Sequence, residues 1–131
     1  MSELSDAQAQ LGAHDDELEM TLLAALIISE GECMGQAWAS RMPFEIFYIP
    51  SHRKVFEEMN RQYHQHSQFD GYTLRSAFIE AQDFDTLANC LNVLTVDPYS
   101  MNEPMPSFAH QYADRLNGYR VKREKARATL H

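Results

Sequence analysis

The chain has 131 residues, of which 44% are hydrophobic, and a formal net charge of −8 at pH 7. That length suits a single domain, and that apolar fraction is sufficient for a packed core, which excludes wholesale disorder. The longest apolar run covers only residues 22–28 and follows acidic residues, which excludes a membrane span and argues against a signal peptide.

The charge is divided unevenly along the chain. Residues 1–113 hold 17 acidic and 5 basic side chains, a net of −12, whereas residues 114–131 hold 2 and 6, a net of +4. An acidic body repels phosphates, so a nucleic-acid reader is not expected there. The basic end either contacts nucleic acid weakly or is a solvated helix end that complements the helix dipole. Its candidate contact residues are Arg120, Lys122, Arg123, Lys125 and Arg127.

The first third of the chain predicts an arm and two helices. Residues 1–13 are small and polar with little apolar periodicity, so we expect a mobile arm. Asp16 and Glu19 form a plausible capping pair for the first helix, which ends near Gly31. Its apolar stripe consists of Leu18, Leu22, Leu23, Leu26 and Ile27. A shorter helix over residues 32–41 ends before Pro43 and directs Met34, Ala37 and Trp38 to the core.

Residues 44–66 carry the most regular helical pattern. The aromatic pair Phe47 and Tyr48 comes just before Pro50, and proline suits the first turn of a helix because its missing N–H needs no partner there. The side chains that share one helix face are His52, Val55, Phe56, Met59 and Tyr63. This spacing indicates a core helix that runs to about residue 66.

Two more helices are predicted between residues 70 and 96. Asp70 caps the first, whose apolar side consists of Leu74, Ala77, Phe78 and Ala81. The second begins at Asp83 or Asp85 and carries Leu87, Cys90, Leu91 and Leu94. Cys90 and Cys33 lie far apart with no C-x-x-C motif, so both are expected to be free thiols in a reducing compartment, which places the protein in the cytoplasm.

The three prolines of residues 97–106 interrupt the helical pattern and mark a connector between residues 14–96 and the last helix. Ser107 is a suitable N-cap for that basic helix, which covers residues 107–131. Along one side of it lie Phe108, Tyr112, Leu116 and Tyr119. Because no strand alternation or hairpin dipeptide occurs, the fold class is all-α, with about six helices in a compact orthogonal bundle.

Few residues suggest catalysis. The chain contains neither G-x-x-x-x-G-K-[ST] nor G-x-G-x-x-G, so no phosphate loop is expected. His64 and His66 point to different faces of a helix, and no cysteine or carboxylate set accompanies them at ligand spacing. Glu57 and Glu58 are adjacent and therefore diverge, whereas catalytic carboxylates must converge on one substrate. We therefore expect no metal, no cofactor and no enzymatic activity of the chain on its own.

Four short motifs occur in order along the chain. They are His14 with Leu18-Glu19 and the apolar run to residue 28, Phe47-Tyr48-x-x-x-His52-Arg53-x-x-Phe56, Asp70-x-x-Thr73-Leu74, and Tyr112-Ala113-Asp114 followed by basic residues and Glu124. In this order they resemble the N-terminal domain of DnaB-type replicative DNA helicases over about residues 14–131. Phe84-Asp85-Thr86 replaces the Gly-Gly turn usual in that family, which is typical of a divergent, phage- or plasmid-borne member.

The resemblance implies a scaffold for DNA replication. Such domains form a collar above the helicase motor, help to hold the hexamer together and dock the C-terminal helicase-binding domain of primase. The motor's Walker motifs do not occur in these residues, and only the first arm of the family's helical hairpin is expected. Without a second arm, Tyr112, Leu116 and Tyr119 either form a partner-binding or homodimer strip or fold back onto the body. The signature residues assigned to the interior are Phe47, Tyr48, His52, Arg53 and Phe56.

Two other functions compete with this one. The chain could be a free-standing phage or plasmid replication protein that mimics the domain as a helicase loader, adaptor or inhibitor, which a stop codon after residue 131 would favour. It could also be an unrelated helical DNA-binding protein that uses its basic end. In that case its affinity for DNA should fall steeply with salt, whereas primase docking should depend on buried apolar contacts.

Overall fold

The structure, a computed structural model, describes residues 3–94 and 106–130. Every regular element in these residues is a helix, which confirms the all-α prediction. The α-helices are α1 (Glu3–Gln10), α2 (Asp16–Ile28), α3 (Ala37–Ser40), α4 (Pro50–His66), α5 (Gly71–Glu80), α6 (Phe84–Leu94) and α7 (Ala109–Leu130). Three short 3-10 helices join them, η1 (Glu32–Gly35), η2 (Phe44–Ile46) and η3 (Pro106–Phe108). Except for Pro106, the predicted connector over residues 97–106 lies outside the described residues.

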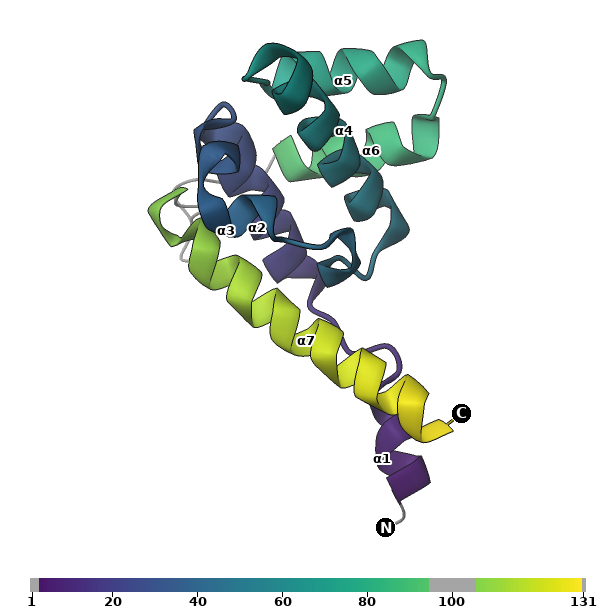
Figure 1. Ribbon diagram of the computed structural model, residues 1–131. Helices are drawn as coiled ribbons and strands as arrows, with labels where there is room; N and C mark the ends of the chain where they lie inside the picture. The colour runs from purple at the N-terminus through teal and green to yellow at the C-terminus, as the bar shows by residue number, and fades with distance from the viewer. Residues whose placement is uncertain (1–2, 95–105, 131) are drawn as a thin grey trace.

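The helices form a body, which contains α2 to α6, and an arm, which consists of α1 and the second half of α7. Helices α2 to α6 cross one another in the body, and the first half of α7 lies along its side against α2 and η2 (Figure 1). The second half of α7 extends past the body, where α1 runs antiparallel beside it (Figure 1). None of the described helices is both long and apolar enough to cross a membrane.

Short polar side chains set where the helices begin. At α5 the Asp70 carboxylate accepts the Thr73 N–H at 2.8 Å, and the Thr73 hydroxyl lies 3.0 Å from the Asp70 nitrogen, which completes a capping box. At α2 the N-cap is Asp15, whose carboxylate accepts the Leu18 N–H at 3.0 Å, so the predicted pair of Asp16 and Glu19 is wrong. Both helix starts use the same device, an oxygen that satisfies an otherwise unpaired N–H.

The core is built from the predicted stripes of α2 and α4. Five side chains here are fully or nearly fully buried: Leu22, Leu23 and Leu26 of α2, and Val55 and Met59 of α4. The rings of Phe47 and Phe44 pack against Phe56 with centroids 5.4 Å apart in both pairs. The predicted stripes therefore face the core in both helices, although α2 also buries Thr21, Ala24 and Ala25 outside its stripe.

Several predicted boundaries are corrected. Residues 1–13, expected as an arm without regular structure, contain α1, whose buried contact residue is Ala7. An alanine contact of this kind leaves no apolar stripe for sequence analysis to detect. The predicted helix over residues 32–41 is divided into η1 and α3, because Gln36 between them is extended, and Ala37 is exposed rather than buried. Ser107 lies inside η3 and is not the N-cap of α7.

Helix α6 is rotated relative to the expected stripe. It buries Thr86, Cys90 and Val93, whereas Leu91 and Leu94 remain 39% and 36% exposed. Of the predicted set only Cys90 is fully buried, and its burial raises the pKa of the thiol to about 11. Both cysteines are free, as predicted. Helix α6 therefore has apolar side chains on two faces, and the described part of the chain covers one of them.

Two glycines allow a matched test of the backbone. Gly118 lies within α7, and a methyl group added there would meet nothing within 4 Å, so Gly118→Ala should raise the free energy of unfolding by about 0.5–1 kcal/mol. Gly31 has φ +96°, where an added Cβ would lie 3.2 Å from the Gln68 Cα, so Gly31→Ala should lower it by about 1 kcal/mol or more. Urea denaturation followed by circular dichroism measures both changes, and a loss of stability in Gly118→Ala would contradict a continuous α7.

Candidate functional site

A buried carboxylate lies at the centre of the signature motif. Glu19 is 0% exposed, and its carboxylate accepts the backbone N–H groups of Tyr48 at 2.9 Å and of Ile49 at 3.3 Å. The same group lies 2.8 Å from Nδ1 of His52, which is itself buried. Three donors converge on one carboxylate, so the charge that burial would otherwise disfavour is fully hydrogen-bonded. Glu19 thereby joins α2 to the start of α4.

The other signature residues complete this junction. The Arg53 guanidinium donates from Nε to the Phe47 carbonyl at 2.6 Å and holds the turn that precedes α4. Phe47, His52 and Phe56 are buried, as predicted. Tyr48 was also assigned to the interior, but it is 38% exposed, and that prediction is wrong. Most of the motif therefore builds the fold and does not face a ligand.

Tyr48 lies at the surface between two side chains from distant parts of the chain. Its ring stacks on the ring of His14, with the two centroids 4.2 Å apart. The guanidinium of Arg123, which belongs to α7, lies 5.4 Å from the centroid of the Tyr48 ring. Stacking and cation–π contacts of this kind favour a fixed ring position. Tyr48 therefore joins the segment before α2, the start of α4 and the middle of α7 without entering the core.

Arg123 is the second buried charge of the junction. It is 1% exposed, and it donates to the carbonyls of Ala13 and Glu45, each at 2.6 Å. Burial lowers the pKa of its guanidinium, and the negative charge of Glu19 opposes that shift. The basic end of the chain predicts Arg123 as a possible nucleic-acid contact. The structure instead places it inside the protein, where it fixes α7 against the loops before α2 and α4.

The remaining basic residues of α7 lie at or near the surface. Arg120 donates to Asn117 at 2.7 Å and pairs with Glu124 at 2.7 Å, so its charge is partly compensated. Lys122 lies 5.3 Å from the centre of the Tyr119 ring, and Lys125 and Arg127 are exposed. Because Arg123 is buried and Arg120 is paired with Glu124, fewer basic side chains of α7 are available to a partner than the sequence predicts. Contact with nucleic acid remains a prediction for the other residues.

The predicted strip on α7 divides into a buried and a surface part. Leu116 is 0% exposed and belongs to the core, whereas Tyr112 and Tyr119 are half-buried beside it. Of the two alternatives, this part of α7 folds back onto the body. Tyr112 and Tyr119 are seven residues apart and share one side of α7, which we call the tyrosine flank. Leu116 can support this flank but cannot itself contact a partner.

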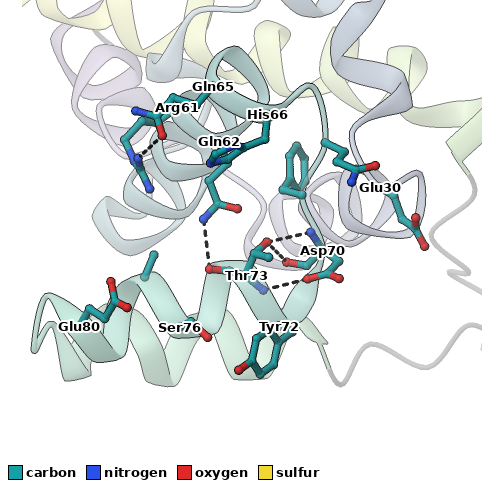
Figure 2. A pocket seen from close by; sticks show the side chains of 13 residues that line it. Glu30, Arg61, Gln62, Gln65, His66, Asp70, Tyr72, Thr73, Ser76 and Glu80 are labelled. Atoms are coloured by element: carbon teal, nitrogen blue, oxygen red, sulfur yellow. Dashed lines mark hydrogen bonds between the residues drawn. The ribbon is translucent and has the colours of Figure 1, made fainter.

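Two of the grooves that the described residues form on the body bring no reactive groups together. The first, of about 570 Å³, lies between α4 and α5, where Gln62 donates to the Thr73 carbonyl at 3.1 Å and Arg61 donates to Gln65 at 2.8 Å (Figure 2). The second, of about 760 Å³, lies between α3 and α7, where the rings of Trp38 and His110 stack 5.1 Å apart. Within the described residues no group of three or more metal-ligating side chains is placed to hold an ion.

The central role of Glu19 predicts a large effect from a small change. Glu19→Gln keeps the size of the side chain but directs an amide donor at groups that also donate. We expect the free energy of unfolding to fall by about 2–4 kcal/mol. Glu57→Gln, an exposed substitution on α4, is the matched control and should change it by no more than about 0.5 kcal/mol. Equal effects in chemical denaturation would contradict the buried junction.

Arg123 and Lys125 provide a second comparison, between a buried and an exposed cation of the same helix. Arg123→Met leaves the carbonyls of Ala13 and Glu45 without their donors and should lower the free energy of unfolding by about 2–4 kcal/mol. Lys125→Met should have almost no effect on stability. Thermal denaturation measures both. Weaker DNA binding by Arg123→Met with unchanged stability would instead restore Arg123 as a nucleic-acid contact.

Comparison with known proteins identifies the family. The family model described as the DnaB-like helicase N terminal domain matches residues 12–114, which include the Glu19 junction and helices α2 to α6. Searches of curated proteins and of solved structures returned no match. The matched region covers most of the chain and agrees with the resemblance carried by the four motifs. The chain therefore belongs to the family of DnaB-like helicase N-terminal domains.

Proposed function

We propose that this chain acts in DNA replication as the non-catalytic N-terminal domain of a replicative helicase, where it helps to hold helicase subunits together and docks primase. The observation that carries the proposal is the family match over residues 12–114, joined to an α7 that continues beyond the matched body. A long helix that extends from a compact body is a suitable shape for joining subunits in a ring. Partner proteins of this kind recognise surfaces, which agrees with grooves that hold no reactive cluster.

The tyrosine flank is the surface that we assign to the partner. Tyr112 and Tyr119 pack partly against the core, so their rings are held in place before any partner arrives. Lys122 lies over Tyr119 and offers a charge at the edge of the same surface. Aromatic side chains with fixed positions and a polar rim are typical of the residues that dominate protein–protein binding.

A titration against the C-terminal helicase-binding domain of a cognate primase tests the docking proposal. We expect saturable binding that survives a rise in salt, because buried apolar contacts are screened little. The double variant Tyr112→Ala and Tyr119→Ala should bind about tenfold more weakly or worse. Tyr72→Ala, which removes an exposed tyrosine from α5, is the matched control and should bind normally.

The same variants separate the competing functions. Sedimentation of the native chain at high micromolar concentration should show self-association that the double variant weakens and Tyr72→Ala does not. Only monomers, together with no primase binding at tens of micromolar, would contradict the collar and docking proposal. Binding to DNA that falls steeply with salt would favour the DNA-binding alternative.

A further inference from the structure

The hairpin of α5 and α6 carries the largest exposed apolar side chains of the body. Of the ten large hydrophobic residues that the described chain leaves exposed, five lie on these two helices. One of them, Tyr72, lies in the first turn of α5, and we call the other four the hairpin patch: Ile79, Phe84, Leu91 and Leu94. Phe84 is 62% exposed and Ile79 is 48% exposed. A concentration of exposed apolar side chains in one short segment is typical of a binding surface.

Ile79 and Phe84 lie on the two sides of the α5–α6 turn, whereas Leu94 lies at the other end of the hairpin, beside Gly71. Phe84 and Leu91 are seven residues apart on α6 and therefore share one face, opposite the buried Cys90 and Val93. Ile79 lies at the end of α5, just before the turn that leads to Phe84. In this turn the Asp83 N–H donates to the Phe78 carbonyl at 3.1 Å, which holds the two helix ends together. The patch thus extends from the hairpin turn along α6.

Acidic side chains lie at the turn end of the patch. Residues 70–94 hold four carboxylates and one basic residue, and Glu80, Asp83 and Asp85 lie at the hairpin turn beside Ile79 and Phe84. The hydroxyl and backbone N–H of Thr86 lower the pKa of Asp83, and Lys54 Nζ lies 3.3 Å from the same carboxylate. Because Asp83 is already paired, Glu80 and Asp85 are the rim carboxylates that a partner would meet. An apolar surface with an acidic rim complements an apolar surface with a basic rim.

This charge pattern disfavours a second copy of the same surface. In a two-fold symmetric contact the hairpin patch would meet itself, and the acidic rims of both copies would lie against each other. Like charges brought together at an interface oppose binding. The rim therefore favours a partner of opposite charge.

We propose that the hairpin patch binds a basic amphipathic helix of a partner protein. Such a helix packs its apolar face on Phe84, Leu91 and Leu94, and its lysine or arginine side chains reach Glu80 and Asp85. The surface is separate from the tyrosine flank, because the α5–α6 turn and α7 lie on opposite sides of the body (Figure 1). The protein would then hold two partners at once, and this proposal does not depend on primase docking.

A designed peptide tests the proposal on the full chain. The probe is a labelled amphipathic peptide of leucine and lysine, about 18 residues long so that it can form a helix. Fluorescence anisotropy should show binding to the native chain that weakens about tenfold in Leu91→Ser and in Phe84→Ser. Leu4→Ser is the matched control, because Leu4 is 54% exposed on α1, far from the patch, and it should bind like the native chain.

The rim is tested separately from the apolar face. Asp85→Lys should weaken binding of the leucine–lysine peptide and strengthen binding of a leucine–glutamate peptide with the same apolar face. Circular dichroism of each variant confirms that the fold is kept. Equal affinity in Leu91→Ser and Leu4→Ser, or equal affinity of both peptides for the native chain, would overturn the proposal. A native dimer that Phe84→Ser dissociates would also overturn it, because a second copy would then occupy the patch.

Discussion

The arrangement of this domain depends on one buried carboxylate. Glu19 lies near the start of α2 and is fully buried, where an uncompensated charge would be strongly unfavourable. The turn before α4 supplies its donors, namely the backbone of Tyr48 and Ile49 and the ring of His52. Because those donors occur together only when α4 begins in this position, the need to satisfy Glu19 selects one packing of α2 against α4.

Arg123 is a second buried charge, and the need to satisfy it fixes the position of α7. A guanidinium buried between Ala13 and Glu45 requires both loops to bring their carbonyls to α7, so three separate segments meet at one side chain. The position of the arm is thus coupled to the junction at the start of α4. A partner that shifted α7 along its axis would have to break these bonds, which makes the arm a stiff extension of the body.

The sequence predicts well the helices that follow from a periodic pattern of apolar residues. It predicts poorly the contacts between residues that lie far apart along the chain. The stripes of α2 and α4, the cap at Asp70 and the all-α class follow from local spacing. Glu19 is predicted as part of a helix cap and Arg123 as a nucleic-acid contact, because the sequence does not show which distant groups bind a polar side chain. In α6 the apolar residues form one wide arc opposite Asp85, Asn89 and Asn92, so spacing alone could not tell which part of that arc is buried.

One aromatic contact has a practical consequence. The chain has a single tryptophan, and the ring of Trp38 lies parallel to that of His110, with an interplanar angle of 8°. The contact joins α3 of the body to the first turn of α7. Indole emission depends on the groups stacked on the ring and on its contact with water. Intrinsic fluorescence from this one residue therefore reports whether α7 remains seated on the body, without any added label.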